Sequence, residues 1–387
     1  MAEIITALDI GASKIVALTA KFSRGGEARL EVLTEYVGKC EGISNGCIMD
    51  LNRVSDSIKR AVGSLGLNNL SASNFIIGLS GKDVGSSVYN EDEIDIAGKA
   101  ITKEHIEEIN RVAGAVSIPS MGMEIKKVRR SYYVDGRRGI LEPPIGIIAN
   151  KLGAEFYAAY ASVAYMRNMS RVLEYAGVNV AEHCSFVPSS MASALAVLGE
   201  EEKTRDVAVV DMGHGTLDLA VYSGGQIVYS NVLDQGGREL LKSLTSHFNI
   251  TERSAYKLLF ENGMAGREYL NGRGDEILEA EFSFKDRRAQ ITLGEFIGVL
   301  EEKIDEFLLW IKKQLKDVKD RLKVSVSGLV ITGGLSMLRK LSQKTKRFLS
   351  ISDPHVVAPC PLRGLSEGMV HPIFSTSVGL LICGIEG

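Results

Sequence analysis

The chain has 387 residues, a hydrophobic content of 45%, a charged content of 24% and a formal net charge of −3. At roughly 150 residues per domain, this length predicts two or three domains with a core large enough to need no disulfide staples. The charge excludes a global basic field that would recruit nucleic acid or anionic lipid. The sequence also lacks basic patches with interleaved aromatic residues, so we expect no nucleic-acid partner.

The five cysteines are widely spaced, and none stands in a C-x-x-C pair. This usage is typical of reduced thiols in the cytosol, and we expect most of them to be small buried apolar groups. The N-terminal residues show no basic segment followed by a long apolar run. No stretch reaches the ~18 apolar residues of a transmembrane helix. We therefore expect a cytoplasmic protein.

Two segments about half a chain apart follow the same pattern. Residues 4–18 and residues 207–221 each contain an apolar, β-branched run that ends in Asp-x-Gly, then a short polar turn, then a second apolar run. This pattern predicts two β-hairpins, each with an acidic residue at its tip. We interpret the pair as an internal duplication with a cleft between the two halves.

Amphipathic helices are predicted between and after these hairpins. Apolar residues recur at helical spacing over residues 51–65, 103–116 and 292–318, which indicates helices with one buried face. Thr292 and Glu295 form a capping box at the start of the longest one.

Three further segments complete the predicted organisation. Residues 328–335 indicate a buried strand that ends in a Gly-Gly turn and leads into a helix. Residues 82–160 mix charged turns, strand-like pieces and a proline pair, and we interpret them as a separate α+β insertion. Residues 375–384 are expected to form the final buried segment, which closes the first half of the fold.

The first Asp-x-Gly turn has the residue types that suit one end of a phosphate chain. Gly11 allows backbone N–H groups to approach phosphate oxygens closely. Ser13 offers a hydrogen-bond donor, and Lys14 supplies a compact positive charge. Asp9 would face Mg²⁺ through water, because Mg²⁺ keeps much of its hydration shell.

The second turn would supply the matching clamp from the other half. Asp211, Gly213, Gly215 and Thr216 repeat the arrangement, and the Gly-Gly turn at 333–334 would pack flat against an adenosine, where a side chain would collide. Each motif alone is common. Three of them in this order, each at the carboxyl end of a buried strand, predict a nucleotide site, because ligands of open α/β sheets bind at such strand ends.

The order of these motifs is similar to that of the actin, sugar-kinase and heat-shock-chaperone ATPase superfamily, and within it the chain most resembles the FtsA family of bacterial division proteins. Residues 9–14 (DIGASK) resemble the family's first phosphate loop, and residues 41–50 (EGISNGCIMD) its turn before the first helix. Residues 133–140 with 144–146 resemble part of the inserted subdomain 1C. The resemblance covers nearly the whole chain. It implies an α/β fold of actin-like, ribonuclease-H-like duplicated domains around a nucleotide cleft, with an FtsA-type 1C insertion.

The resemblance also implies subdomains and ligand residues. Subdomain 1A would take residues 1–81 and 161–202, 1C residues 82–160, 2A residues 203–236, 2B residues 237–325, and residues 326–387 would hold the rest of 2A and the closing 1A segment. ATP would contact Gly11, Ala12, Ser13, Lys14, Gly213, His214, Gly215, Thr216, Gly237, Lys257, Gly333, Gly334 and Leu335. Asp9 and Asp211 would hold Mg²⁺ through water and are also the candidate catalytic residues.

The family's role implies an assembling scaffold. The expected partners are further copies of the chain in a filament, the C-terminal peptide of FtsZ, and other division proteins. The expected place is the inner face of the cell membrane at the division site. This sequence stops without an interfacial amphipathic helix, so we expect membrane contact only indirectly, through a partner, or through a C-terminal helix that the sequence lacks.

Two departures from the family's pattern bear on hydrolysis. His214 replaces the middle glycine of the second phosphate loop, and Leu217 replaces a threonine. The imidazole would either contact the phosphates or turn to solvent. Ser189-Ser190 stand where many members carry Glu-Pro, and serine is a poor general base. We therefore expect ATP binding with slow or absent hydrolysis.

Two other departures concern the nucleoside. Tyr256 and Leu259 occupy positions that often offer Glu and Lys to the ribose and base, so Lys257 is expected to reach the base only indirectly. Leu335 stands where a third glycine is frequent after Gly333 and Gly334.

A basic cluster and two alternative functions remain open. The cluster consists of Lys126, Lys127, Arg129, Arg130, Arg137 and Arg138. It is either a surface for an acidic partner or lipid, or a solvated strand face, which is the usual fate of such runs. The alternatives are a pilus-assembly cytoplasmic adaptor of the same architecture and a small-molecule kinase, in which Asp211 or Asp218 would face an acceptor hydroxyl.

Overall fold

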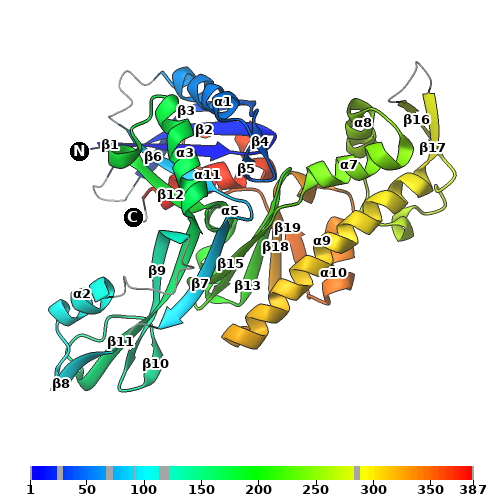
Figure 1. Ribbon diagram of the computed structural model, residues 1–387. Coiled ribbons are helices and arrows are strands. Elements are labelled where there is room, and N and C mark those ends of the chain that lie inside the picture. The colour runs from blue at the N-terminus through cyan, green and yellow to red at the C-terminus, as the bar shows by residue number, and fades with distance from the viewer. Residues whose placement is uncertain are drawn as a thin grey trace.

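The computed structural model describes residues 2–23, 29–66, 73–90, 93–112, 122–282 and 288–385. Two five-stranded sheets and the helices around them form the body of the molecule, and a third five-stranded sheet extends from it (Figure 1). We call the first sheet with its outer helices the first lobe, and the second sheet with its outer helices the second lobe.

The two main sheets have the same strand order. The first runs β12 (Cys184–Pro188), β6 (Ser73–Leu79), β1 (Ala2–Ile10), β2 (Lys14–Ser23), β3 (Arg29–Lys39). The second runs β19 (Pro354–Val356), β18 (Gly328–Thr332), β13 (Val207–Met212), β14 (Leu217–Ser223), β15 (Gln226–Leu233). In both sheets the last three strands pair antiparallel and the first three pair parallel. The duplication expected from the two hairpins is therefore confirmed, and it extends to the whole sheet.

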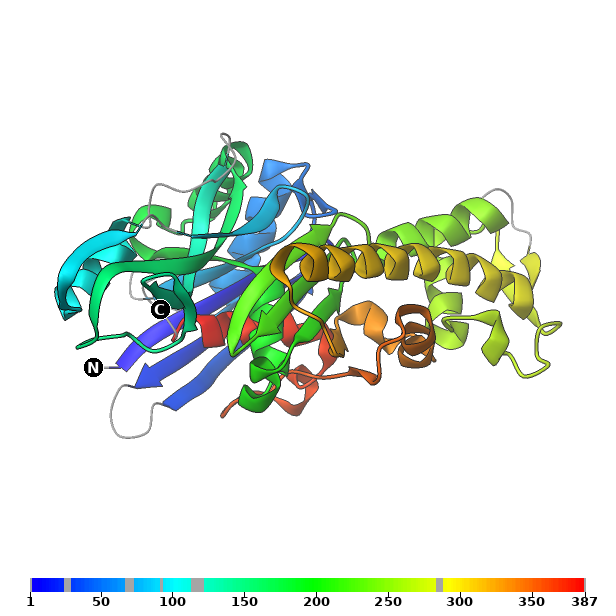
Figure 2. The ribbon, with the colours of Figure 1, turned by 90° about the horizontal axis from the view of Figure 1, so that it is seen from below.

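Two helices, α5 (Ser189–Val197) and α11 (Ser375–Cys383), lie between the sheets; α11 is the red helix between the blue and green strands in Figure 2. One buried cluster joins both helices to the inner faces of both sheets. Successive strand residues face opposite sides, so Val209 belongs to this central cluster and Val210 to the outer core of the second lobe. Most of the predicted final segment, residues 375–384, is buried, as predicted.

The outer faces are covered by longer helices. These are α1 (Leu51–Ser64) and α3 (Val163–Tyr175) on the first lobe, and α7 (Gly237–Phe248), α8 (Glu252–Asn262), α9 (Leu293–Leu322) and α10 (Leu341–Leu349) on the second. The predicted capping box starts α9: the Thr292 hydroxyl accepts from the Glu295 N–H at 3.2 Å, and the Glu295 carboxylate accepts from the Thr292 N–H at 3.2 Å. Such a box satisfies N–H groups that the helix itself leaves unpaired.

The described residues of the predicted insertion form a sheet and the helix α2, drawn at the lower left of Figure 1. Its elements are β7 (Val84–Asn90), β8 (Ile94–Ala100), α2 (Lys103–Val112), β9 (Gly122–Val134), β10 (Arg137–Ile140) and β11 (Ile148–Ser162). The long strand β11 pairs with β7, β8 and β9. The insertion has its own buried cluster, which includes Ile109, Tyr132 and Phe156. The helix predicted over 103–116 is described as far as Val112, and residues 113–116 lie outside the described residues.

Short elements complete the fold: β4 (Ile43–Ser44), β5 (Cys47–Ile48), α4 (Val180–His183), α6 (Glu200–Thr204), β16 (Ile277–Glu281), β17 (Arg288–Thr292) and the 3₁₀ turns Arg267–Tyr269, Gly334–Met337, Glu367–Met369 and Pro372–Phe374. After Gly333-Gly334 the chain makes only a 3₁₀ turn before α10. None of the helices in the described part of the chain is long and apolar enough to cross a membrane.

No disulfide joins the five cysteines, all of which lie in the described ranges, but the expectation that most are buried was wrong. Only Cys40 and Cys383 are buried, whereas Cys360 is exposed and the other two are half-buried. Cys47 belongs to the small β4–β5 hairpin and Cys184 to the edge strand β12, and neither position is covered on all sides.

Candidate functional site

The two Asp-x-Gly turns have the same backbone hydrogen bond. The Gly11 N–H donates to the Lys14 carbonyl at 2.9 Å, and the Gly213 N–H donates to the Thr216 carbonyl at 2.9 Å. A Cβ on either glycine would lie 3.0 Å from that same carbonyl oxygen, which is tighter than ordinary van der Waals contact. The turn itself thus favours a glycine in each Asp-x-Gly, because a side chain would press on the carbonyl that closes the turn.

These two turns meet across the gap between the lobes. A Cβ on Gly215 would lie 2.7 Å from the Cβ of Ala12 and would also press on the backbone of Asn45. Among the described residues, no acceptor pairs with the N–H groups of Ala12, Ser13, His214 or Gly215. Unpaired amides on two facing turns form a concave site for an anion. The structure therefore brings together the turn residues that the sequence nominated.

Two carboxylates, the half-buried Asp9 and the buried Asp211, stand beside the turns. Asp9 ends the β1 side of the first hairpin and Asp211 the β13 side of the second. Burial raises the pKa of Asp9, which nearby Lys14 partly offsets. Burial also raises the pKa of Asp211 to about 6, and the charge of Asp9 adds to this rise. Two carboxylates that repel each other in a buried site suit a divalent cation, and Mg²⁺ commonly takes one or two carboxylates while keeping its waters. Within the described ranges, no three His, Cys, Asp or Glu side chains group as a metal site.

A third carboxylate, Asp218, links the lobes and was not among the predicted ligands. Its Oδ2 accepts from the hydroxyls of Ser80 and Thr216, both at 2.8 Å. The side chain is 5% exposed, and its Oδ1 has no partner among the described residues. Burial, followed by the charge of Asp211, raises its pKa to about 7. Ser80 follows β6 in the first lobe, and no sequence signal singles it out.

His214 turns toward α7 and is half-buried. A Cβ on Gly237 would lie 3.5 Å from its Nδ1, and its carbonyl accepts from the Arg238 N–H at 2.8 Å. Burial, then the charge of Arg238, lowers the pKa of the imidazole, so the ring is neutral at pH 7. The sequence left open whether the imidazole contacts the phosphates or turns to solvent. In the structure the ring is not fully exposed at the loop tip.

The Gly-Gly turn needs its first glycine for a different reason from the one predicted. Gly333 has φ +85, and a Cβ there would collide with the Asp211 carboxylate and the Met212 backbone. The predicted collision with adenosine is therefore not needed to explain Gly333. A Cβ on Gly334 would meet only Ile373, at 3.8 Å, so the protein leaves room there. The Leu335 side chain is 8% exposed and belongs to the second lobe's core, so only its backbone can face a ligand.

The structure does not bring Lys257 to the turns. It is exposed on α8, beside Tyr256, which is 61% exposed. No hydrogen bond or ion pair among the described residues links Lys257 to either turn. Ser189 and Ser190 are buried at the start of α5, and this helix offers no carboxylate near Asp211.

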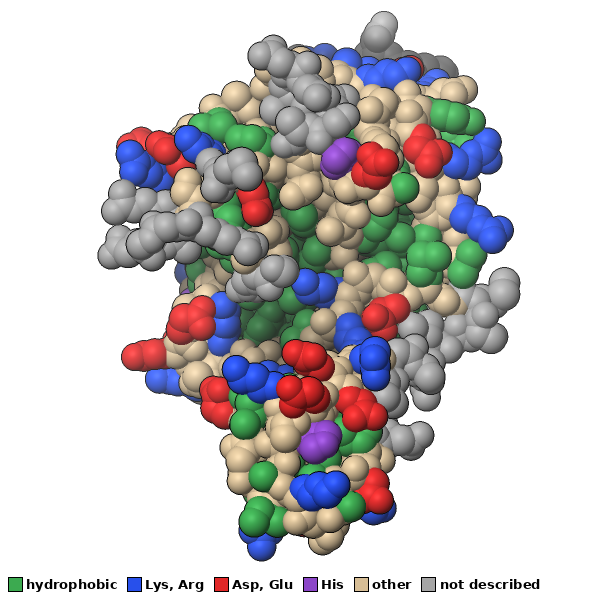
Figure 3. Space-filling model, turned by 90° about the vertical axis from the view of Figure 1, so that its left-hand side faces the viewer, with side chains coloured by type: hydrophobic (Ala, Val, Ile, Leu, Met, Phe, Trp, Pro, Cys, Tyr) green, Lys and Arg blue, Asp and Glu red, His purple; other side chains and the backbone are tan. Residues whose placement is uncertain are grey.

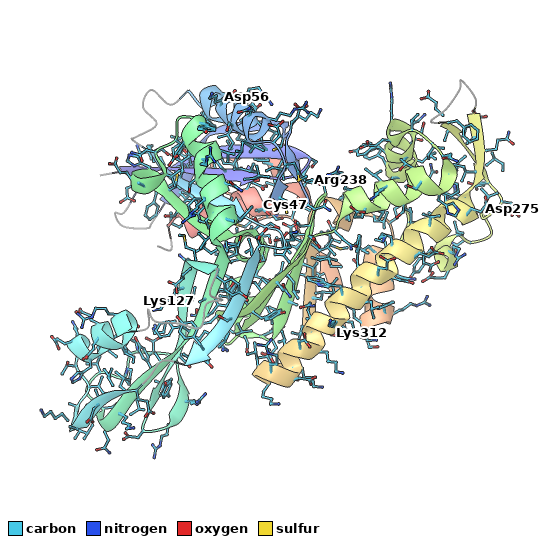
Figure 4. All side chains as sticks on the ribbon, in the orientation of Figure 1. Cys47, Asp56, Lys127, Arg238, Asp275 and Lys312 are labelled. Carbon is cyan, nitrogen blue, oxygen red and sulfur yellow. The ribbon has the colours of Figure 1, made fainter. Side chains whose placement is uncertain are left out.

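Polar contacts between α7 and the β4–β5 hairpin join the two lobes beside the turns, and sequence reasoning missed them. The Arg238 guanidinium donates to the Ser44 hydroxyl, and the Asn45 amide donates to Glu239 at 3.4 Å. Figure 4 labels Arg238 and Cys47 where the two lobes approach each other. Long polar side chains at this position would restrict the entry and exit of a ligand.

The basic cluster of the insertion is largely engaged by the insertion itself. Lys127 lies 4.5 Å over Phe156, Arg129 lies 4.3 Å over Tyr132, Arg138 lies 5.5 Å over Tyr133, and Arg130 pairs with Glu155 at 2.8 Å. Cations over aromatic faces are stabilised there. The sequence allowed the cluster to be either a surface for an acidic partner or lipid, or a solvated strand face. This arrangement favours the strand face.

A hollow of about 640 Å³ lies away from the turns, between α3, β9 and β12. Its lining includes Met123, Ile125, Met166, Cys184 and Phe186. Figure 3 shows apolar side chains gathered between the wide upper part of the molecule and the narrower lower part. This hollow shares no residue with the two turns, so it is a separate feature of the surface.

The matching sheets, with two glycine turns meeting between them, define a protein of the actin-like fold class. Solved structures agree: the "PilM-PilN type IV pilus biogenesis complex" aligns with a TM-score of 0.65 and 14% identity over 100% of this chain and 99% of that one. MreB 5 of Spiroplasma citri bound to AMPPNP aligns with a TM-score of 0.57 and 12% identity over 99% of this chain and 95% of that one. At these identities the likeness shows the fold alone.

Sequence comparisons identify the family. The model of "Cell division protein FtsA" matches residues 208–379, and that of the "SHS2 domain inserted in FTSA" matches residues 84–159. The cell division protein FtsA of Pseudomonas aeruginosa is 24% identical over 99% of this chain and 90% of its own length. The chain belongs to the FtsA family of cell-division proteins.

Proposed function

We propose that this cell-division protein binds ATP between its lobes and assembles into filaments that recruit other division proteins. The observation that carries the proposal is the pair of facing turns, with four N–H groups that have no acceptor among the described residues and with the carboxylates of Asp9 and Asp211 beside them. The bound AMPPNP named for the similarly folded MreB 5 supports the choice of ligand.

Each residue of the turns has a defined task in this proposal. The amides of Ala12, Ser13, His214 and Gly215 would bind phosphate oxygens, and Lys14 would add a positive charge. Asp9 and Asp211 would hold Mg²⁺ through its waters; the bound ion would neutralise phosphate charge. Gly213, Thr216 and Gly237 would also contact the nucleotide from the second turn, and Gly334 with the backbone of Leu335 would form the surface for adenosine.

Calorimetric titration with ATP and Mg²⁺ tests the binding. We expect a single site with a dissociation constant in the micromolar range, on the order of −8 kcal/mol. A dissociation constant above about 1 mM, equivalent to roughly −4 kcal/mol, would remove ATP from the proposal.

Hydrolysis is proposed to be slow or absent. The start of α5 presents the hydroxyls of Ser189 and Ser190 and no carboxylate, and a hydroxyl cannot act as a general base near neutral pH. Steady-state phosphate release should stay below about one per minute, compared with ~10 per second for a typical enzyme. Faster release would show that another group, such as Asp218, activates water.

Assembly is proposed to depend on the insertion. Removing all of 82–160 would also remove Ser86 and Tyr157, which hydrogen-bond Ser230 of the second lobe at 2.7 Å each. A sharper deletion uses the β7–β11 register, in which Asn90 pairs with Glu155: residues 91–154 are replaced by Asn-Gly, which favours a tight hairpin. This variant should keep ATP binding and lose ATP-dependent pelleting. Pelleting at the wild-type level would refute the role of the insertion.

The partners complete the proposal. The FtsZ C-terminal peptide is the expected ligand that connects FtsZ filaments to this protein, at the inner face of the membrane at the division site. Attachment to the membrane is proposed to run through a partner protein or through a C-terminal helix that lies outside this sequence. Binding of a fluorescent FtsZ peptide, together with liposome co-sedimentation with and without added division proteins, tests both statements. Strong sedimentation of the purified chain alone would contradict both routes of attachment.

A further inference from the structure

The first turn of α11 contacts the carboxylates of both lobes through consecutive hydroxyls. The Ser377 hydroxyl donates to Asp9 Oδ2 at 3.0 Å, and the Thr376 hydroxyl donates to Asp211 Oδ2 at 2.7 Å. These pairs join residues 368 and 165 positions apart in the chain. Asp9 belongs to the first lobe and Asp211 to the second, so one helical turn touches the acidic tip of both hairpins.

Both hydroxyls are buried, and each donates its hydrogen bond to one of the two carboxylates. Thr376 is 9% exposed and Ser377 is 0% exposed. Serine and threonine at a helix start commonly cap their own backbone, whereas these two bond carboxylates from distant strands. The preceding residue, Ser375, bonds the Thr332 hydroxyl at 2.6 Å and not a carboxylate, so the arrangement belongs to Thr376 and Ser377 alone within this turn.

The helix that carries these hydroxyls is held firmly. A Cβ on Gly379 would collide with the backbone of Ala192 in α5, so α11 and α5 approach each other at backbone distance. Residues Ser375 to Leu381 of α11 are all buried. A donor on such a rigid element fixes the orientation of its acceptor more closely than a donor on a loop would.

We propose that Thr376 and Ser377 are positioning residues for Mg²⁺: they hold one oxygen of Asp211 and one of Asp9, and so set the spacing and direction of the two carboxylates that face the ion. This rests on the proposed function, because it needs Mg²⁺–ATP in the cleft. Donors behind metal-facing carboxylates typically change metal affinity 10- to 100-fold when removed.

The test separates Mg²⁺ from ATP. ATP affinity is measured by titration at a series of Mg²⁺ concentrations and in EDTA, for wild type, Thr376→Val, Ser377→Ala and Thr376→Ser. We expect T376V and S377A each to need about 10-fold more Mg²⁺ for half of the Mg²⁺-dependent gain in ATP affinity. Their ATP affinity in EDTA should stay within about twofold of wild type, because the turn amides are unchanged. T376S, which keeps the hydroxyl, should restore the wild-type Mg²⁺ dependence.

Ser375→Ala is the matched control, since it removes a neighbouring hydroxyl of the same turn that bonds Thr332. It should leave the Mg²⁺ dependence unchanged even where it lowers the melting temperature. Folded T376V and S377A proteins with wild-type Mg²⁺ dependence would overturn the proposal while leaving ATP binding intact. If T376V does not fold, S377A decides. If the wild-type chain binds no ATP at any Mg²⁺ concentration, both the proposed function and this inference are contradicted.

Discussion

The turn at Gly11 and the turn at Gly213 share one backbone hydrogen bond, but their surroundings differ. The first turn presents Lys14, whose ammonium lies 5.6 Å from the Phe374 ring, and an exposed Ser13. The second has a half-buried, neutral His214 against α7 and a buried Gly215 that presses on the first turn. The duplicated backbone thus supplies amides from both lobes. The positive charge comes from Lys14 of the first lobe, whereas the close contact between the turns depends on Gly215 of the second lobe.

The largest effect is expected where the two turns touch. Gly215→Val should lower ATP affinity at least about 100-fold, or ~2.8 kcal/mol, because its side chain would collide with Ala12 and the Asn45 backbone. Gly274→Ala is the control, since a Cβ at Gly274 meets nothing within 4 Å. Both are measured by calorimetric titration with Mg²⁺–ATP. Affinity of G215V within threefold of wild type would show that the contact between the turns does not shape the site.

The asymmetry in charge gives the next prediction. Lys14→Met should lower ATP affinity about 10- to 100-fold, because a charge-assisted hydrogen bond contributes roughly 1.5–3 kcal/mol. His214→Gly, which restores the family's usual glycine in the second turn, should change affinity by no more than about threefold, since the ring is neutral. Titrations on the two variants under identical conditions measure this. Equal losses would mean that the second turn also contributes through its side chain.

The third prediction concerns pH and the nucleotide-free protein. Burial raises the pKa of Asp218 from its ordinary value of 3.8 to about 7 in the folded state, so the folded chain binds more protons than the unfolded chain between these values. Its contribution to stability is therefore present at low pH and is lost as the pH rises toward 7, by about 1.4 kcal/mol per pKa unit.

Urea unfolding at pH 5 and pH 7.5 measures that dependence. The wild type should lose more stability over this interval than Asp218→Asn, which removes the titrating group while keeping its shape. Asp275→Asn, at an exposed position of the second lobe, serves as the control and should behave as wild type. A pH dependence in D218N as steep as that of the wild type would assign the loss to other groups.

The smallest effect is expected far from the turns. Lys257→Ala should change ATP affinity by less than about threefold, or ~0.6 kcal/mol, because Lys257 is exposed and contacts neither turn. The same titration checks it. A tenfold loss would indicate that α8 closes onto the nucleotide when it binds.

Much of the site could be nominated from local patterns. The turn residues Gly11, Lys14, Gly213 and Thr216 follow apolar runs whose alternation and length mark strands, and a glycine at such a strand end has a local steric reason. Local patterns could not tell whether a glycine is needed to contact a ligand or to let the protein pack. Gly333 is needed because Asp211 approaches it closely, and that contact exists only in the folded chain.

The sequence by itself determined the two hairpins, the capping box that starts α9 and the insertion, because these follow from side-chain periodicity and from hydrogen bonds between residues close in the chain. Only the tertiary structure decided that Ser80 meets Asp218, and that Thr376 and Ser377 meet Asp211 and Asp9. These hydroxyls lie in segments that look like ordinary buried strand ends and helix. Thr376 and Ser377 reach the carboxylates because α11 is packed between the two sheets, and Ser80 reaches Asp218 because the end of β6 lies against the second hairpin. The packing of distant layers cannot be derived from any one stretch of residues.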